Sequence, residues 1–326
     1  MIRIEKGNSP LVLCLPHSGS VLPDAVLNRF NATGRLQTDM SWRLEQVLTF
    51  AAELDATLIR TTVSRYVVDV DKDPSQAEPS NAARNSLCPT ATLDGKRIYR
   101  PDEEPGPTEI EQRLLLFHKP FHDALRLEIN RLRHSHKRIV LIDCQSMRSR
   151  IRGVCDGGLP IVSIGSGDGR SCDPELRGVF ANAFDGVPGF SVGVDDSFSG
   201  GYITTSCGQP DHGVHAMTMV LAQRSYLRHE SPPFEPDKSR IGDVRAAVAS
   251  ALSKVVGWTE AARHESDNDQ PSTKMADTPA QQPPTASPAE GKSRPAVRQE
   301  LKPLKTPPQD GSAQPTAGRS DVLVAE

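Results

Sequence analysis

The chain has 326 residues, with 38 Lys and Arg against 41 Asp and Glu, a net charge of −3 and 37% hydrophobic residues. This near-neutral balance gives no support for nucleic-acid binding. No apolar run approaches the ~18 residues that span a bilayer, and the first residues lack the apolar core of a signal peptide, so we expect a cytoplasmic protein. The six cysteines are scattered without a Cys-x-x-Cys pair, which indicates reduced thiols.

The first strong element is the apolar run of residues 10–16, which predicts a buried strand that leads into Pro16-His17-Ser18-Gly19. A histidine that directly follows a strand is well placed to be a metal ligand or a catalytic base, although a structural role is an open alternative. Apolar residues at helical spacing then predict a helix over 41–54, with Asp39 ahead of its first turn. Strands are expected over 56–62 and 66–70.

A long polar segment, residues 74–106, follows and has the length of a lid or binding segment. It contains a possible hairpin at 93–99 around Asp94-Gly95. Residues 109–132 then predict a long amphipathic helix that is interrupted at Pro120.

Residues 137–147 contain an unbroken apolar run that predicts a strand buried on both faces. Such strands present their carboxyl ends to the crevice where α/β proteins bind ligands, so this strand is expected to deliver Asp143 and Gln145 to a site. In the alternative, Asp143 caps a turn and Gln145 packs locally.

Further strands are expected over 159–164 and 190–194, and Gly-rich loops over 165–169, 199–205 and 208–215. Residues 216–227 are consistent with either a strand or a helix. Apolar spacing predicts the last helix over 241–256. Alternating strands and helices indicate one α/β domain, residues 1–258, with a mostly parallel sheet. Residues 259–326 hold ten of the 27 prolines and no aromatic residue, so we expect a disordered C-terminal tail.

The order of eight motifs over residues 10–230 resembles the N-formylglutamate amidohydrolase (N-formylglutamate deformylase) family. The motifs are Pro16-His17-Ser18-Gly19 with Pro23, Ser64 to Asp69, Gly95 to Arg100, Pro120-Phe121-His122, Asp143 to Met147, Gly165 to Pro174, Gly200 to Thr204 and Gly213 to Ala216. The resemblance implies a three-layer α/β/α sandwich around a mixed sheet, similar to zinc carboxypeptidases and aspartoacylases. It also implies hydrolysis of the formyl amide of a small acidic N-acyl amino acid, within histidine degradation.

This chemistry needs a divalent metal that activates water, a carboxylate that takes a proton, and a cation that holds the substrate carboxylate. The resemblance implies a metal site, for zinc, at His17, Asp39 and Gln145. It implies catalytic roles for Arg65 and His122. The substrate-binding positions that it implies are Lys72, Gly200, Gly201 and Tyr202.

Four positions depart from the family pattern. Gln145 stands where the motif Asp-Cys-His-Ser-Met has its histidine, and an amide is a poor zinc ligand. Asp71-Lys72 replaces Asn-Arg, which places a carboxylate near the expected position of the substrate carboxylate. Val220 replaces the glutamate expected as general base, and Ser41 replaces a second aspartate.

Two interpretations follow. In the first, the chain is a metal-dependent amidohydrolase with a rearranged site that recruits His122, His212 or His215. In the second, it keeps the fold without the chemistry and acts as a ligand-binding or regulatory protein. The sequence does not separate them, and it does not give the oligomeric state.

Overall fold

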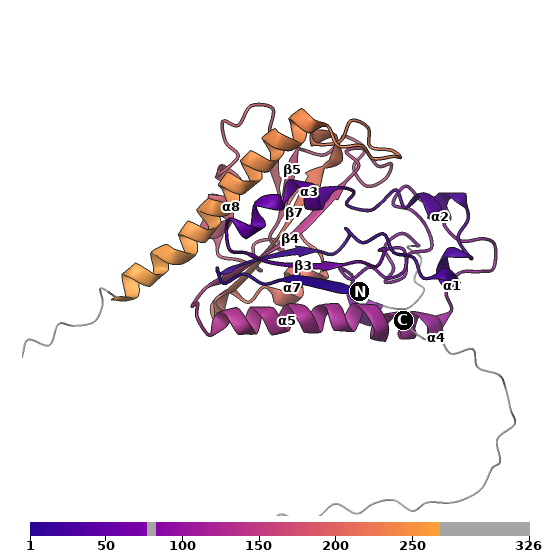
Figure 1. Cartoon of the computed structure of the whole chain (residues 1–326), viewed down its shortest axis with the longest axis horizontal. Coiled ribbons are helices and arrows are strands. Elements are labelled where there is room, and N and C mark those ends of the chain that lie inside the picture. The colour runs from indigo at the N-terminus through magenta and orange to yellow at the C-terminus, as the bar shows by residue number, and fades with distance from the viewer. Residues whose placement is uncertain (77–82, 268–326) are drawn as a thin grey trace, which may run out of the picture. The chain divides into compact units, whose positions relative to one another are not determined.

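Seven strands form one mixed sheet at the centre of the fold (Figure 1). The structure, a computed structural model, describes residues 1–76 and 83–267. The strand order is β1-β3-β2-β4-β7-β5-β6. The pairs β3–β2, β2–β4, β4–β7 and β5–β6 are parallel, whereas β1–β3 and β5–β7 are antiparallel. The strand bounds are β1 Ile2–Glu5, β2 Leu11–Leu15, β3 Thr57–Thr61, β4 Ile139–Met147, β5 Val162–Gly165, β6 Val192–Val194 and β7 Val214–Ala222.

The two central strands, β4 and β7, explain the continuous apolar runs in the sequence. Every residue of β7 is buried, and so is every residue of β4 except Met147. They pair over nine residues, in a register that sets Gln145 opposite Val220. Strands buried on both faces need apolar side chains in both directions, which removes the alternation of a half-exposed strand. The predicted strand at 137–147 is therefore confirmed, and the ambiguous run from 216 is a strand up to Ala222.

Helices cover both faces of the sheet, as the predicted α/β/α sandwich requires. On one face, Leu11, Leu13 and Leu15 of β2 pack in a core with α3 (Leu44–Val47), α6 (Pro174–Asn182) and α8 (Lys238–Asp267). On the other face, Val12 and Cys14 pack with α4 (Pro107–Arg113), α5 (Lys119–Arg133) and α7 (Tyr202–Cys207). Figure 1 shows α8 and α5 on opposite sides of the strands.

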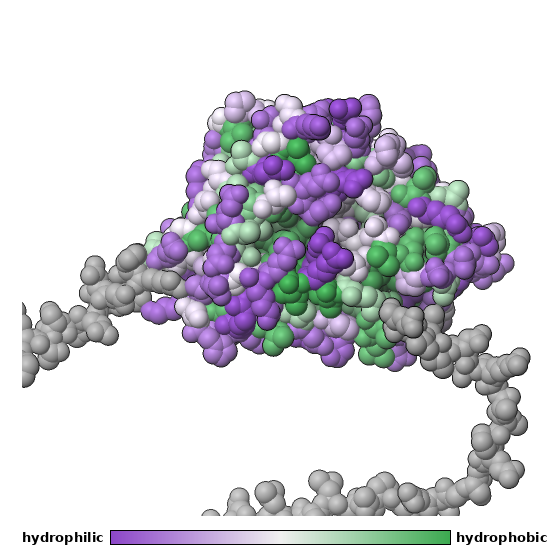
Figure 2. Space-filling model, in the orientation of Figure 1, coloured by the Kyte–Doolittle hydropathy of each residue, from purple (hydrophilic) through white to green (hydrophobic). Residues whose placement is uncertain are grey.

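The remaining helical turns are short and connect these layers. They are α1 Asp24–Leu27, α2 Ala32–Leu36, η1 Thr49–Ala52, η2 Pro74–Gln76, η3 Leu114–His118, η4 Pro210–His212 and η5 Gln223–Ser225. In Figure 2, polar and apolar residues are interspersed over the face in view. None of the helices in the described parts of the chain is long and apolar enough to cross a membrane.

Several predicted elements differ from the structure. Residues 66–70 are not a strand, because local bonds such as Val67 N–H to Ser64 C=O form a turn there and direct Tyr66 and Val68 into different cores. The helix expected over 41–54 is split into α3 and the 3-10 turn η1.

The hairpin at 93–99 is reduced to one bridge between Ala91 and Arg97. The Gly-rich loop expected over 199–205 contains the start of α7. Pro120 does not interrupt the helical run: α4, the π-helical turn η3 and α5 follow one another without a gap, and Pro120 lies directly after η3.

The last helix is longer than predicted. Helix α8 begins at Lys238 and continues to Asp267, beyond the expected domain boundary at Trp258. The rest of the predicted tail, residues 268–326, lies outside the described residues. All six cysteines are free thiols, as predicted, and five of them are buried.

Candidate functional site

A cavity of about 390 Å³ lies at the carboxyl ends of the parallel strands β2, β4 and β7. His17 reaches it from the turn after β2, Gln145 and Met147 from the end of β4, and Thr218 and Val220 from β7. This edge is where the α/β topology opens a crevice, since parallel strands end there side by side.

The cavity, which we call the cleft, gathers most of the site residues predicted from the sequence. Those that line it are His17, Arg65, Lys72, Gln145, Gly200, Gly201 and Val220. Asp39, His122 and Tyr202 are not among the lining residues. The cleft also receives Arg84, Asn85 and Leu93 from the long polar segment that was expected to bind a ligand.

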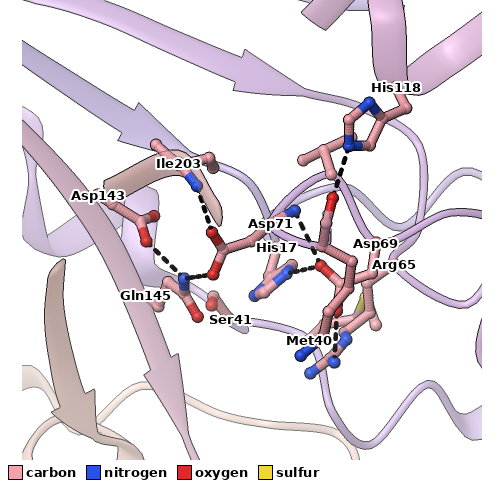
Figure 3. Close-up of polar contacts among 12 residues, drawn as sticks. His17, Met40, Ser41, Arg65, Asp69, Asp71, His118, Asp143, Gln145 and Ile203 are labelled. Carbon is pink, nitrogen blue, oxygen red and sulfur yellow. Dashed lines mark hydrogen bonds and ion pairs between the residues drawn. The ribbon is translucent and has the colours of Figure 1, made fainter. Parts of the chain in front are cut away.

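Gln145 holds two buried carboxylates together. Its Nε2 donates to Asp71 Oδ2 at 2.9 Å and to Asp143 Oδ2 at 2.7 Å (Figure 3). Burial raises the pKa of Asp71 and, more strongly, that of Asp143, and a neighbouring carboxylate adds to each shift. Both amide hydrogens of Gln145 are therefore used within the protein, where a neutral imidazole could donate only one.

Asp71 also caps helix α7. Its Oδ1 accepts a hydrogen bond of 2.9 Å from the backbone N–H of Ile203, in the first turn of that helix. A Cβ at Gly201 would lie 1.9 Å from Asp71 Oδ2, so the glycine is required for space. This carboxylate, which the sequence places near the expected position of the substrate carboxylate, lines the cleft, with its oxygens accepting from Ile203 and Gln145.

His17 belongs to a second buried network, centred on Asp69. His17 Nε2 lies 2.7 Å from Asp69 Oδ1, and Arg65 Nη2 donates to Asp69 Oδ2 at 2.7 Å (Figure 3). Burial opposes the charge of Asp69, but Arg65 and His17 outweigh it and hold the pKa well below its usual value. Asp69 was not singled out as a site residue; its place in the Ser64-to-Asp69 motif, four residues after Arg65, was the available signal.

Asp39 is buried beside the cleft with its carboxylate fully engaged. It accepts hydrogen bonds from Tyr66 Oη at 2.7 Å, Leu93 N–H at 2.8 Å and Arg148 Nη2 at 2.9 Å. These contacts fix the turn that carries Leu93 into the lining of the cleft. Nearby, Ser41 Oγ bonds the backbone of Ser146, so this departure from the family pattern supports β4.

The donor set expected for zinc does not fit a metal in this arrangement. Both oxygens of Asp39 accept hydrogen bonds, and the Gln145 Nε2 donates to two carboxylates, which leaves its Oε1, a weak zinc ligand, beside a His17 whose Nε2 faces Asp69. Across residues 1–76 and 83–267, no three His, Cys, Asp or Glu side chains are grouped so that they could hold a metal ion.

His122 and Tyr202 line a different cavity, of about 170 Å³, between α5 and α7. His122 Nε2 lies 2.7 Å from the carbonyl oxygen of Val70, and its ring is 5.1 Å from that of Tyr202. Burial, with the adjacent His118, lowers the pKa of His122 to about 4. His212 and His215 are not among the residues lining the cleft either, so the structure does not bring a substitute histidine to Gln145.

Known proteins similar to this chain agree with the architecture described above. A sequence model described as N-formylglutamate amidohydrolase matches residues 9–227. The N-formylglutamate deformylase of Pseudomonas aeruginosa is 32% identical over 259 residues, which are 79% of this chain and 97% of that protein. A protein of the same name from Pseudomonas putida is 31% identical over 263 residues, covering 79% of this chain and 96% of the other.

Two solved structures share the fold. The N-formylglutamate amidohydrolase from Ralstonia eutropha JMP134 superposes with a TM-score of 0.66 at 19% identity, covering 80% of this chain and 98% of the other. A gene product from Agrobacterium tumefaciens gives a TM-score of 0.58 at 15% identity, covering 78% and 95%. From the match over residues 9–227 and the identity to the two deformylases, this chain belongs to the N-formylglutamate amidohydrolase family.

Proposed function

We propose that this chain binds a small acidic N-acyl amino acid in the cleft and hydrolyses its amide bond slowly or not at all. The observation that carries the proposal is the position of the Gln145 amide between Asp71 and Asp143. Gln145 stands where the family motif has a metal-binding histidine, and both N–H groups of its amide are directed into the protein.

Charge in the cleft supports recognition of a carboxylate. Lys72, Arg84 and Arg65 line it together with Asp69 and Asp71, and Arg65 forms an ion pair with Asp69. Arginine binds a carboxylate through two parallel N–H groups, and lysine as a point charge. Asp71, the nearby acid, has a raised pKa and accepts hydrogen bonds from the protein, which reduces its repulsion of an anionic ligand.

The same part of the cleft does not supply the general base that amide hydrolysis needs, and its predicted metal ligands are engaged in hydrogen bonds. Val220 lies directly opposite Gln145 on β7, so an apolar side chain occupies the position expected for a general base. When bound, a metal would polarise the amide carbonyl and activate a water, but the predicted ligands are arranged for hydrogen bonds within the protein. Loss of a general base alone typically lowers the rate by ~10²–10⁴.

A second candidate is a metal-dependent amidohydrolase that keeps its activity. It is favoured by the two relatives named N-formylglutamate deformylase, which this chain matches over 96–97% of their length. In this candidate Gln145 would face a metal with its Oε1, because both N–H groups of its amide are bonded to Asp71 and Asp143.

Calorimetry tests the binding that both candidates require, and formate release separates them. Calorimetry should detect N-formylglutamate binding to the wild-type protein. Formate release with zinc, cobalt or manganese should be at least ~10²-fold slower for the wild type than for Gln145→His/Val220→Glu, because the variant regains an imidazole ligand and a carboxylate. Adding Asp71→Asn and Lys72→Arg should strengthen binding of acidic substrates specifically.

The control is Gln46→His, which adds a histidine on helix α3 outside the cleft. It should not increase zinc binding or formate release. Rapid metal-dependent turnover by the wild type would refute the main proposal and establish the second candidate.

A further inference from the structure

One wall of the cleft is apolar. Met147, Val154 and Phe198 line it as half-buried side chains, and Val220 continues the wall on β7. A formyl group has only one carbon and needs no such surface. The wall therefore indicates a ligand with a larger apolar part.

The apolar wall is fixed by the packing behind it. Met147, Val154 and Phe198 rest on a small buried cluster made of Leu93, Ile151, Cys155, Leu159 and Ala222. Leu93 is held in turn by its backbone hydrogen bond to the buried Asp39. A binding surface that is preformed in this way loses little conformational entropy when a ligand arrives.

The wall begins beside Gln145. Met147 lies two residues beyond Gln145 on β4, so both side chains point to the same face of the sheet, and Val220 is the register partner of Gln145. An amide bond bound near Gln145 would therefore have Val220 and Met147 beside it.

The polar groups of the ligand have cationic partners in the cleft. An acidic amino acid has two carboxylates, which need cations, and Lys72 and Arg84 line the cleft. The acyl group is then the part of an N-acyl acidic amino acid that is free to contact apolar side chains. The volume of about 390 Å³ falls in the range of sites for drug-sized ligands, roughly 300–1,000 Å³, and leaves room for it.

We propose that the preferred ligand is an acidic amino acid whose amino group carries an apolar acyl chain of several carbons, and that Met147, Val154 and Phe198 select this chain. The proposal rests on the function proposed above and specifies its ligand class. It makes the apolar wall the determinant of specificity for the acyl chain, with Arg84, whose Nη1 donates to the Leu93 carbonyl at 3.2 Å, adjoining the wall as a cation for a carboxylate.

The test is calorimetric binding of N-formyl-, N-butyryl- and N-hexanoyl-glutamate to the full chain. Each methylene removed from water strengthens binding roughly three- to four-fold, so the hexanoyl compound should bind at least ~10-fold more tightly than the formyl compound. In Phe198→Ala this ratio should fall toward one. The matched control Phe190→Ala removes a half-buried phenylalanine that packs on Phe184 outside the cleft, and should keep the wild-type ratio.

The outcomes separate the two proposals. Binding of N-formylglutamate with no gain for the longer chains would overturn the chain-length proposal and leave the proposed function standing. Binding of none of the three compounds would overturn the proposed function and the ligand class together. An equal loss of the ratio in Phe198→Ala and Phe190→Ala would show that the apolar wall does not select the chain.

Discussion

At the scale of single residues, Gln145 shows how one side chain changes a site. A side-chain amide has two N–H donors on one nitrogen, which allows Gln145 to bridge Asp71 and Asp143. The departures from the family pattern are therefore neighbours in space. Gln145 bonds Asp71 and lies opposite Val220 in the strand register, although the three residues are far apart in the sequence.

Removing the amide should destabilise the protein. In Gln145→Ala, Asp71 Oδ2 loses its donor and Asp143 Oδ2 keeps only the Thr218 hydroxyl at 3.2 Å, and leaving a buried acceptor unsatisfied typically costs about 1–3 kcal/mol. Urea unfolding should show this loss, whereas Gln46→Ala, a half-buried glutamine outside the cleft, should cost less than about 0.5 kcal/mol. Equal losses in the two variants would argue against the bridge.

His122 should make stability depend on pH. Burial lowers its pKa to about 4, below the ordinary value of 6.5, so the folded protein favours the neutral ring. Its contribution to stability is complete above pH 6.5 and is lost as the pH falls toward 4. Between pH 7 and pH 5 the wild type should lose about 2 kcal/mol more than His122→Gln, in which this group no longer titrates.

Chemical denaturation at pH 7 and at pH 5 measures this difference. His134→Gln, at the exposed end of the same helix, is the control and should change with pH as the wild type does. A wild-type response that His122→Gln does not reduce would exclude His122 as its source.

At the scale of elements, helix α7 is positioned by a residue from another part of the chain. Asp71 accepts from the Ile203 N–H, and the Gly201 backbone lies against its carboxylate. Gly201 has φ −96°, which any residue can adopt, so it is steric room and not backbone freedom that requires glycine. Gly201, in the motif Gly200-Gly201-Tyr202, thus leaves the space in which Asp71 bonds both Ile203 and Gln145.

Gly201→Ala should be strongly unfavourable because its Cβ would collide with Asp71 Oδ2. We expect a loss of about 1–3 kcal/mol in the free energy of unfolding. Gly178→Ala, where a Cβ in helix α6 meets nothing within 4 Å, should instead stabilise by roughly 0.5–1 kcal/mol. If combining Gly201→Ala with Asp71→Ala restores no stability, the collision is not the cause.

At the scale of the whole molecule, helix α8 completes the layer on one face of the sheet (Figure 1). Its Trp258 stacks against the Arg138 guanidinium at 4.2 Å and donates to Glu175 at 3.0 Å. These contacts join Arg138, the residue before β4, and helix α6 to the last helix.

Two truncations should behave differently. A chain that ends at residue 256 loses Trp258 and should be less stable by about 3 kcal/mol or more, as for deletion of a large buried aromatic side chain. A chain that ends at residue 267 should melt as the full chain does, because the removed segment has no aromatic residue and dense proline. A fall of more than a few degrees in the second case would contradict the compositional argument.

The sequence by itself determined the layered α/β class, the buried strand at 137–147 and the family, because continuous apolar runs and ordered motifs are local signals. Most of the site residues that it predicted line the cleft. It did not predict the turn at 66–70, because tertiary packing draws Tyr66 and Val68 into different cores in place of a strand.

Only the tertiary structure decided which residues of the candidate site form hydrogen bonds with one another. Asp39 and His122 match family positions in the sequence, yet the contacts of Asp39 with Arg148 and of His122 with Val70 keep both out of the cleft lining. The pairing of Gln145 with Asp71 joins residues 74 positions apart. Such hydrogen bonds depend on which strands and turns become neighbours, and no local pattern in the chain specifies this.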